Sequence, residues 1–166
     1  MSTPQPIIRI GQRSDIPAAL GLVRELAVYE KEPDAVLVSE AEMEAAGFGP
    51  NKLFDFFVAE LEGTVIGLAL YFEHYSTWTG RCLHLEDLYV QEAHRKTGVG
   101  GQLFHAVVAE ANTRGVRRMQ WQVLDWNTPA INFYNKLEAK LDGEWINCQL
   151  NRAQIEQLAG AASAAP

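Results

Sequence analysis

The sequence predicts an α/β (α+β) fold in which helices flank a mixed sheet. Apolar, β-rich runs at residues 56–61 and 65–72 surround Glu62-Gly63, a dipeptide typical of a hairpin turn. Downstream, the patterns read as strand, helix, strand, helix and strand, which is typical of a mixed sheet covered by helices. A chain of 166 residues is long enough for one substantial core and too short for two ordinary domains. We therefore expect a single domain over residues 1–166.

The first predicted elements are a short strand at residues 7–10 and a helix that Ser14 can cap. The helix has one apolar stripe at helical spacing, made of Ile16, Leu20, Val23 and Ala27. A second, short helix is predicted by Ser39-Glu-Ala-Glu42, which has the form of a capping box. We expect Gly47 to close this helix.

The elements after the hairpin begin with a turn at Thr77-Trp-Thr-Gly80, which leads into a central strand at about residues 83–90. A long helix runs from Gly100 to near Gly115, because glycine suits the left-handed residue that follows a helix. The later predicted elements are a strand at 118–124, a helix at 128–136, a strand at 145–150 and a weak helix after Asn151. Residues 160–166 are rich in alanine, and we expect a frayed tail there.

The composition argues against several classes of protein. A formal net charge of −7 opposes a nucleic-acid partner, whose phosphates require a basic surface. No apolar stretch approaches the roughly 20 residues that a membrane-spanning helix needs. The N-terminal residues lack a basic region followed by an apolar run, so we expect a cytoplasmic protein. An acidic surface is compatible with a polycationic substrate and equally with an ordinary soluble protein.

The cysteines and histidines predict no metal site. Cys82 and Cys148 lie far apart and outside any Cys-x-x-Cys spacing, which favours buried free thiols over a disulfide or a pair of ligands. The histidines lack the i, i+4 pairing of a zinc-binding helix, and we interpret them as surface or core residues. They are His74, His84, His94 and His105.

Residues 95–101 have the features of an anion-binding loop. Three of them are glycines, and they open a helix whose first N–H groups have no partner within the helix. The helix dipole favours negative charge at that end, and Arg95 and Lys96 add positive charge beside it. A P-loop would end in Gly-Lys-Ser/Thr, and a dinucleotide-binding loop would need a third glycine where Leu103 stands. The loop therefore predicts a different pyrophosphate site.

The motif Arg95-x-x-Gly98-x-Gly100 resembles the Gln/Arg-x-x-Gly-x-Gly/Ala motif of the GNAT acetyltransferases, whose loop and helix N-terminus hold the pyrophosphate of coenzyme A. The similarity extends to Leu85-Glu-Asp-Leu-Tyr-Val90 and to Asp125-Trp-Asn127-Thr-Pro-Ala-Ile-Asn-Phe-Tyr134. These stretches look most like the diamine (polyamine and thialysine) acetyltransferases. The resemblance covers about residues 7–150. It implies the GNAT fold, whose twisted, mostly antiparallel sheet is splayed between its fourth and fifth strands around acetyl-CoA.

The resemblance also implies which residues bind the cofactor. Backbone groups of Leu88 and Val90 are expected to pair with the pantetheine amides as an added strand would. The full set of implied cofactor-binding residues is Leu88, Tyr89, Val90, Arg95, Lys96, Thr97, Gly98, Val99, Gly100, Gly101, Asn127, Pro129 and Ala130.

Acetyl transfer to an amine requires that an alkyl ammonium, with a pKa of about 10.4 in water, lose a proton and that the leaving thiolate gain one. Glu86 is the candidate base, because related enzymes use a glutamate here directly or through water; the alternative is a strand carboxylate in an ion pair. Asp87 would lie on the opposite face of a regular strand, but a bulge, which the family has here, would turn both toward the site. Tyr134 is the candidate acid, and the alternative is a core tyrosine.

Aromatic and acidic side chains could form a pocket for an alkyl cation. The candidate substrate-binding residues are Tyr29, Glu30, Trp78, Glu86, Asp87 and Trp145. Ser76 replaces an acidic residue of the polyamine acetyltransferases, so we favour a lysine-like amine such as thialysine over spermidine. Glu138 replaces the glycine usual after Asn-Phe-Tyr, which leaves the geometry of that turn open. The alternatives are acetylation of a protein lysine or N-terminus or of an aminoglycoside, and a non-catalytic acetyl-CoA-binding module.

We also expect a homodimer. Residues 137–150 are predicted to form a final strand pair, and strands of this region pack across a two-fold interface in the resembling enzymes. The apolar side chains of this segment are Leu137, Leu141, Trp145, Ile146 and Leu150.

Overall fold

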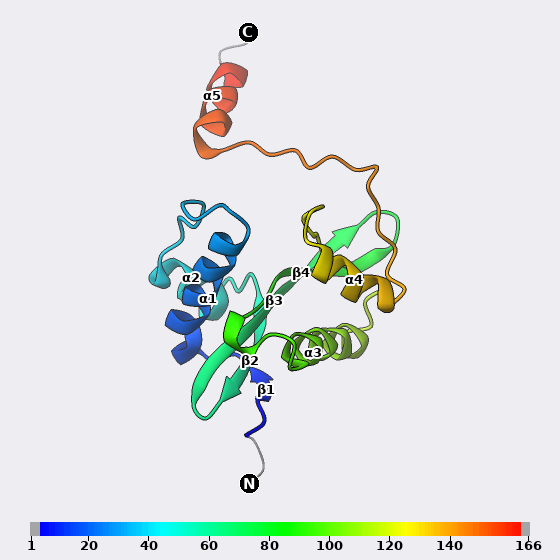
Figure 1. The fold of residues 1–166 in the computed structure, drawn as a ribbon. Coiled ribbons are helices and arrows are strands. Elements are labelled where there is room, and N and C mark those ends of the chain that lie inside the picture. The colour runs from blue at the N-terminus through cyan, green and yellow to red at the C-terminus, as the bar shows by residue number, and fades with distance from the viewer. Residues whose placement is uncertain (1–3, 164–166) are drawn as a thin grey trace. The chain divides into compact units, whose positions relative to one another are not determined.

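One five-stranded sheet organises the first of two compact units, which run to Leu124 and from Asp125 (Figure 1). The computed structural model describes residues 4–163. The strands are β1 (Ile7–Ile10), β2 (Asp55–Leu61), β3 (Thr64–Ser76), β4 (Gly80–Val90) and β5 (Arg118–Gln120). They lie side by side in this order, and all neighbours are antiparallel except β4 and β5, which are parallel. The predicted α/β class with a mixed sheet is confirmed.

Helices cover both faces of the sheet. The helices of this unit are η1 (Arg13–Asp15), α1 (Ile16–Tyr29), α2 (Glu40–Phe48), η2 (Glu92–His94) and α3 (Val99–Thr113). α1 and α2 lie on one face and α3 lies on the other (Figure 1). The apolar stripe of α1 packs against the sheet, where Ile16 and Leu20 share a core with Val58 and Leu68. Burial of one such side chain stabilises the fold by about 1.5–3 kcal/mol.

The start of α1 differs from the prediction, because Asp15 and not Ser14 precedes the helix. The Asp15 carboxylate accepts hydrogen bonds from the Arg9 guanidinium at 2.7 and 2.9 Å and from the Gln12 N–H at 2.7 Å. The hydrogen bonds from Arg9 hold the pKa of Asp15 below its usual value. This ion pair ties the short turn η1 to β1, and it sets the position at which the helix begins.

The capping box of α2 is confirmed. The Ser39 N–H donates to Glu42 Oε2 at 2.8 Å, and the Glu42 N–H donates to Ser39 Oγ at 3.2 Å. The predicted end at Gly47 is wrong. The helix continues through Phe48 to Gly49, whose N–H donates to the Ala45 carbonyl at 2.9 Å.

The hairpin turn is confirmed, since Glu62 and Gly63 adopt φ of 50° and 80° between β2 and β3. Left-handed values at both positions are typical of a type I′ turn. β3 is longer than predicted and reaches Ser76, because residues 71–76 of β3 pair with residues 80–85 of β4. The Ser76 hydroxyl accepts hydrogen bonds from the Trp78 and Thr79 N–H groups at 3.2 and 3.3 Å. Ser76 therefore shapes the turn between β3 and β4.

β5 is shorter than predicted and ends at Gln120 instead of Leu124. It pairs with β4 only over residues 82–84. Trp121 lies edge-on against Phe104 of α3, with ring centroids 5.2 Å apart. β4 continues for six residues beyond this pairing, so the sheet opens between β4 and β5, as the resemblance implied.

The second unit contains α4 (Thr128–Lys136) and α5 (Arg152–Ser163). Asn127 caps α4, and its side-chain oxygen accepts a hydrogen bond from the Ala130 N–H at 3.4 Å. The predicted strand at 145–150 is wrong: in the described part of this unit, residues 139–151 form no strand, and residues 140–151 are exposed. A strand needs a partner for its backbone groups, and the apolar pattern alone does not supply one. α5 includes residues 160–163 of the expected tail, whereas 164–166 lie outside the described residues.

The turn after α4 is a Schellman motif with glutamate in the position that glycine usually occupies. The Ala139 N–H donates to the Tyr134 carbonyl at 3.2 Å, and the Glu138 N–H donates to the Asn135 carbonyl at 3.1 Å. Glu138 has a φ of 56°, which a side chain disfavours. We expect Glu138→Gly to raise the free energy of unfolding by up to about 1 kcal/mol, measured by denaturant unfolding. A clear loss of stability would contradict this account of the turn.

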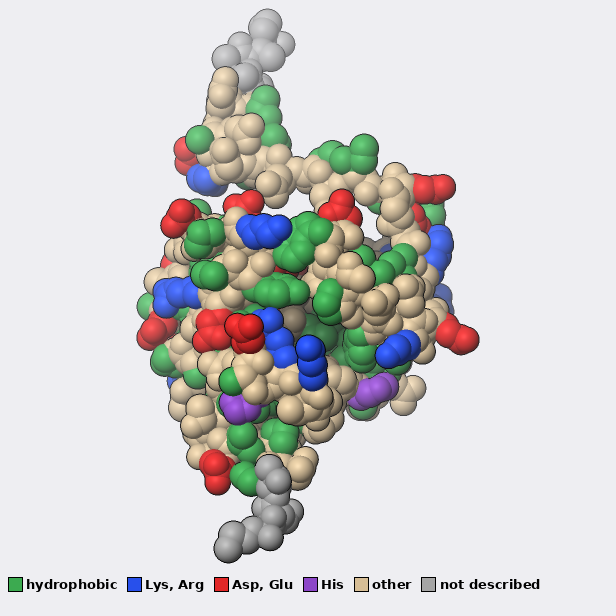
Figure 2. All heavy atoms as spheres, in the orientation of Figure 1, with side chains coloured by type: hydrophobic (Ala, Val, Ile, Leu, Met, Phe, Trp, Pro, Cys, Tyr) green, Lys and Arg blue, Asp and Glu red, His purple; other side chains and the backbone are tan. Residues whose placement is uncertain are grey.

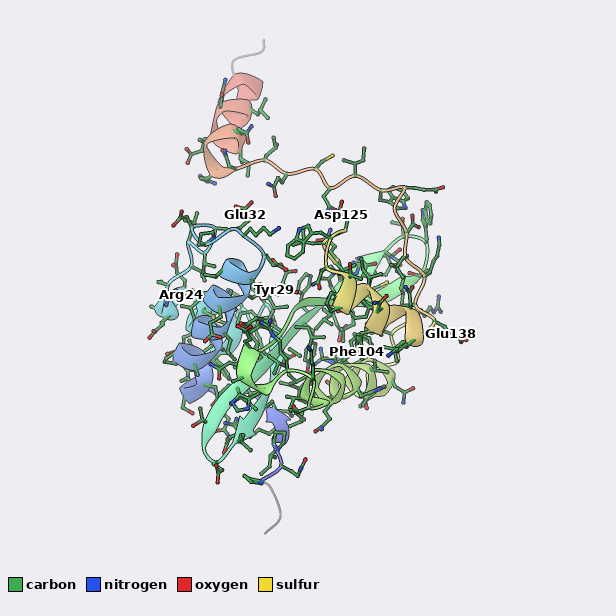
Figure 3. All side chains as sticks on the ribbon, in the orientation of Figure 1. Arg24, Tyr29, Glu32, Phe104, Asp125 and Glu138 are labelled. Carbon is green, nitrogen blue, oxygen red and sulfur yellow. The ribbon has the colours of Figure 1, made fainter. Side chains whose placement is uncertain are left out.

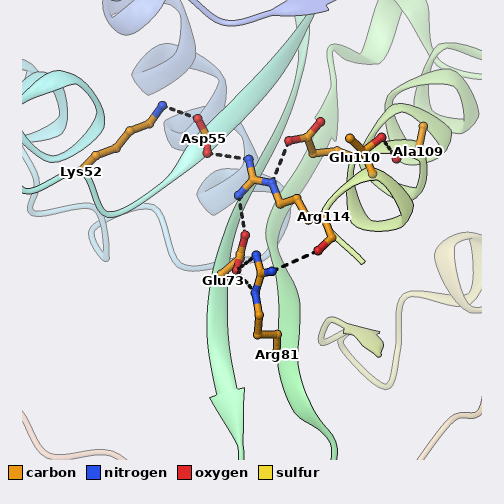
Figure 4. A network of polar contacts seen from close by, with 8 residues as sticks. Lys52, Asp55, Glu73, Arg81, Ala109, Glu110 and Arg114 are labelled. Atoms are coloured by element: carbon orange, nitrogen blue, oxygen red, sulfur yellow. Dashed lines mark hydrogen bonds and ion pairs between the residues drawn. The ribbon is translucent and has the colours of Figure 1, made fainter. Parts of the chain in front are cut away.

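Arg114, just after α3, joins three carboxylates from different elements (Figure 4). Its guanidinium contacts Asp55 of β2 at 2.9 Å, Glu73 of β3 at 3.1 Å and Glu110 of α3 at 2.7 Å. It also lies over the Tyr71 ring, 5.3 Å from the centroid. These ion pairs hold the end of α3 against the sheet, and so they fix the direction in which the start of α3 points.

We expect Arg114→Ala to lower the free energy of unfolding by about 2 kcal/mol, because three partly buried carboxylates would lose their shared cation. Denaturant unfolding measures the loss. The matched control is Arg13→Ala, which removes an exposed ion pair with Glu44 and should cost no more than about 1 kcal/mol. Equal losses in the two variants would contradict a special role for Arg114.

Candidate active site

A β-bulge in β4 brings two carboxylates together. Leu70 of β3 lies opposite Asp87, whereas the next residue, Tyr71, lies opposite Leu85. Glu86 is therefore the extra residue, and both Glu86 and Asp87 oppose one residue of β3. Leu70 belongs to the core under α1, so the carboxylates lie at the α1 face of the sheet. Adjacent strand residues ordinarily point to opposite faces, and the bulge removes that separation.

The carboxylates at the bulge differ in their electrostatics. Burial, followed by the charges of Glu86 and Glu30, raises the pKa of Asp87 to about 6. Glu30 lies directly after α1, and burial raises its pKa as well. The hydrogen bond from His84, with Nε2 and Oε2 3.3 Å apart, lowers the pKa of Glu86. The cluster thus places a carboxylate that ionises readily beside one that takes up a proton near pH 6.

Tyr29 and Arg95 connect the end of α1 to the end of β4. Figure 3 shows Tyr29 at the C-terminal end of α1. The Arg95 guanidinium lies over the rings of Tyr29 and Tyr89, 4.7 and 5.1 Å from their centroids. Its Nε donates to the Val90 carbonyl at 2.9 Å. Arg95 is therefore held against β4 and α1, and it braces the loop that follows.

The loop before α3 leaves a helix N-terminus open. Lys96 and Gly98 have φ values of 63° and 89°, and α3 begins at Val99. The Gln102 N–H donates to the Gly98 carbonyl at 3.0 Å, so the N–H groups of residues 99–101 precede the first intrahelical hydrogen bond. No side chain obstructs Gly100, where an added Cβ would lie 3.8 Å from Val90 Cγ2. This arrangement suits an anionic ligand.

Comparison with known proteins identifies the family. Residues 23–138 match the acetyltransferase (GNAT) family. The thialysine N-epsilon-acetyltransferase of Sus scrofa is 36% identical over 165 residues, which cover 93% of this chain and 97% of that protein. The chain belongs to the GNAT family of acetyltransferases.

Two further matches support the assignment of this chain to the GNAT family. The spermidine/spermine N(1)-acetyltransferase-like protein 1 of Homo sapiens is 32% identical over 162 residues, which cover 92% of this chain and 23% of that protein. A solved aminoglycoside N-acetyltransferase in complex with CoA has a TM-score of 0.73 at 20% identity, over 91% of this chain and 97% of that one, and so shares the fold. The protein is an acetyl-CoA-dependent N-acetyltransferase.

Two features of the first unit fit acetyl-CoA: the start of α3 and the edge of β4. Backbone N–H groups at 99–101, with Lys96 nearby in sequence, have the chemistry that a pyrophosphate requires. Beyond His84, the edge of β4 toward β5 is not paired with β5, so the backbone from Leu88 to Val90 can pair with amide groups. The Val90 carbonyl accepts a hydrogen bond from Arg95. Its oxygen has a second lone pair, which can accept another hydrogen bond.

Trp78 of the acetyltransferase is not near the bulge. It lies in the turn between β3 and β4 with 82% of its surface exposed. Six residue pairs of the ladder separate this turn from the pair Leu70–Asp87, a length of about 20 Å. Tyr29 and Glu30, by contrast, lie at the end of α1, and the charge of Glu30 acts on Asp87.

The other predicted site residues belong to the second unit. Tyr134 is buried on α4, and burial raises the pKa of its hydroxyl to about 12. Pro129 lies in the first turn of α4, between the cap Asn127 and Ala130. Trp145 is 73% exposed in the segment without regular structure.

The interpretation of His84 from sequence missed its contact with Glu86. The signal was present, because residues two apart on a strand share a face. The prediction of buried thiols holds for Cys82 and is wrong for Cys148, which is exposed in the irregular segment of the second unit.

Metal clusters and membrane-spanning helices are absent from the described residues 4–163. No group of three or more His, Cys, Asp or Glu side chains there could hold a metal ion. None of the helices in this range is long and apolar enough to cross a membrane. On the face drawn in Figure 2, acidic and basic side chains are interspersed.

Proposed function

We propose that this acetyltransferase transfers the acetyl group of acetyl-CoA to the primary amine of a small molecule of the diamine, polyamine or thialysine kind. The observation that carries the proposal is the bulge in β4, which sets Glu86 and Asp87 at one face beside Glu30. Such a cluster can neutralise an alkyl cation and accept its proton. The names of the relatives in Sus scrofa and Homo sapiens support the same class of acceptor.

In the proposed reaction the amine attacks the acyl group directly, so that a C–N bond forms and the C–S bond breaks. Acetyl-CoA supplies the activated acyl group when it is bound. Glu86 takes a proton from the acceptor ammonium, directly or through water, and later releases it to solvent. A glutamate is ionised at neutral pH, and the hydrogen bond from His84 lowers the pKa of Glu86 further. Asp87 and Glu30 attract the cation without having to accept its proton.

Tyr134 is the proposed acid for the leaving sulfur: its hydroxyl proton goes to the thiolate, and the second proton that the amine nitrogen loses as the amide forms restores the hydroxyl through solvent. Burial raises the pKa of its hydroxyl to about 12, so the hydroxyl carries its proton throughout the neutral range. We expect Tyr134→Phe to lower kcat by about 10- to 100-fold, at the lower end of general-acid effects because a thiolate is a good leaving group. The Kd for acetyl-CoA, measured by calorimetry, should stay unchanged. Wild-type turnover in this variant would remove Tyr134 from the mechanism.

The names of the relatives support a lysine-like acceptor, because the match in Sus scrofa over 93% of this chain is a thialysine N-epsilon-acetyltransferase. Ser76 lies in the turn about 20 Å from the bulge, where its hydroxyl accepts from the backbone, so it does not reach the carboxylate cluster. We therefore rank thialysine above spermidine. The alternatives are a protein lysine or N-terminus, or an aminoglycoside.

The family assignment favours an enzyme over the non-catalytic acetyl-CoA-binding module that the sequence left open. Calorimetry with acetyl-CoA, combined with a thiol-release assay, separates the two. The proposal predicts binding together with acceptor-dependent thiol release, whereas binding without release with any amine would support the module.

We expect Asp87→Asn to raise the KM for a cationic acceptor by about tenfold at pH 7.5, because one carboxylate of the cluster is lost. In the wild type, Asp87 loses its charge as the pH falls through about 6, so the acceptor KM should rise there. The variant should lack that component of the pH dependence. An acceptor KM that is the same in both proteins at pH 7.5 would exclude Asp87 from the site.

The stability of the Asp87→Asn variant gives a second test of the raised pKa of Asp87. The pKa of Asp87 is raised in the folded protein from 3.8 to about 6, so folding is favoured by its protonation. This contribution is complete below the ordinary pKa and is lost as the pH rises through about 6. Asn keeps the uncharged form at every pH. We therefore expect a higher Tm than the wild type at pH 7.5, with a difference that narrows as the pH falls through about 6 and vanishes only below pH 3.8.

We further propose that the chain is one domain over residues 1–166 and assembles as a homodimer. The family match at 23–138 includes parts of both units, which supports a single domain. Exposed apolar side chains in the second unit support a dimer, and they include Leu141, Trp145, Ile146 and Leu150. A monomeric mass by light scattering at micromolar concentration would contradict the dimer.

A further inference from the structure

We propose that His84 is a positioning residue that holds the Glu86 carboxylate in place for proton removal from the acceptor amine. The inference rests on the proposed role of Glu86 as the base. It concerns a residue interpreted from the sequence as a surface or core histidine.

The geometry directs His84 at Glu86. The two residues are two apart on β4, and His84 Nε2 lies 3.3 Å from Glu86 Oε2. The His84 side chain is only 16% exposed, whereas that of Glu86 is 53% exposed. Because Glu86 is the extra residue of the bulge, it has no residue of its own opposite it on β3. His84 therefore restrains the Glu86 carboxylate.

The imidazole is itself held by aromatic neighbours. Phe72 of β3 lies opposite His84, with ring centroids 5.1 Å apart and planes inclined by 32°. The His74 ring meets His84 edge-on at 6.3 Å. Because the His84 ring is already confined, it loses little further conformational entropy when it donates a hydrogen bond to Glu86.

Charged groups lie on both sides of the hydrogen bond between His84 and Glu86. On one side, the carboxylates of Asp87 and Glu30 gather negative charge near Glu86. On the other side lie His74, whose pKa is lowered mainly by burial, and Arg118 of β5, whose charge acts on His74. The hydrogen bond from His84 outweighs the effect of burial and lowers the pKa of Glu86.

The contact also determines which imidazole nitrogen carries the proton. An ionised carboxylate only accepts hydrogen bonds, so the hydrogen bond requires a proton on Nε2. His84 in this state donates to Glu86. The role is therefore to orient the base.

The test compares His84→Phe, which keeps a flat ring and removes the donor, with His84→Gln, which keeps an N–H donor. We expect His84→Phe to lower kcat by about tenfold, with the Kd for acetyl-CoA unchanged. The acid limb of the kcat profile at saturating acceptor, which excludes the effect of Asp87 on KM, should move to higher pH, because the pKa of Glu86 is no longer lowered. His84→Gln should recover most of the rate and restore the limb. His105→Gln, an exposed histidine on α3, is the matched control and should leave activity unchanged.

A double-mutant cycle with Glu86→Gln completes the test. The inference predicts that His84→Phe has little further effect once Glu86 is replaced. An equal tenfold loss in both backgrounds would overturn it, as would a loss in His84→Gln as large as in His84→Phe. If Glu86→Gln alone left the rate unchanged, the failure would lie in the proposed role of Glu86 and not in its contact with His84.

Discussion

Glu86→Gln is expected to lower kcat by about 10²- to 10⁴-fold, the usual contribution of a general base. The amide cannot accept the ammonium proton, while its shape and its place in the bulge are retained. The loss should be largest at lower pH, where the acceptor is most fully protonated. Stopped assays of thiol release across pH 6 to 9, at saturating acetyl-CoA, measure it.

The matched control is Glu92→Gln, an exposed glutamate in η2 just beyond β4. It removes the same charge close to the site without touching the bulge, and its kcat should equal that of the wild type. Equal rates in the wild type and in Glu86→Gln across this pH range would remove the base from the mechanism. A higher acceptor KM with unchanged kcat would instead indicate a role in binding the acceptor.

Gly100→Glu is expected to weaken acetyl-CoA binding by at least about 100-fold, because a carboxylate would occupy the place of the pyrophosphate at the start of α3. The backbone tolerates the change, since a Cβ at this position would lie at ordinary contact distance, 3.8 Å, from Val90 Cγ2. A glutamate in the first turn also interacts favourably with the helix dipole. Binding should therefore be lost without loss of the fold, as calorimetry and thermal unfolding together would show.

Ala41→Glu is the control for added charge. Ala41 is exposed at the second position of α2, which corresponds to Gly100 in α3. This variant carries the same charge at the same helical position and should bind acetyl-CoA as the wild type does. An unchanged affinity in Gly100→Glu would show that the loop at 95–101 does not hold the pyrophosphate.

Local patterns were sufficient to predict most of the first unit. The helical period of α1, the capping box at Ser39 and the Glu62-Gly63 turn are each set by neighbours in the sequence, and each is confirmed. The strand at 145–150 failed because a strand depends on a partner strand, which no local pattern supplies. The ion pairs of Arg114 could not be predicted either, since they join residues far apart in the chain.

For the site, the sequence placed Glu86 and Asp87 side by side, but only the resemblance suggested the bulge that the register now shows. The packing of Arg95 on Tyr29 and Tyr89 was not predictable, because it brings together three segments of the chain. The pKa of Asp87 depends in the same way on burial and on Glu30, which lies 57 positions earlier in the chain.

The most direct test of the proposed function is a thiol-release assay with acetyl-CoA and a panel of acceptors. The panel contains thialysine, lysine, putrescine, spermidine, spermine, an aminoglycoside and a histone-tail peptide. We predict turnover of the small amines, with thialysine highest in kcat/KM. Turnover confined to the aminoglycoside or to the peptide would contradict the proposed acceptor class and leave the acetyltransferase assignment in place.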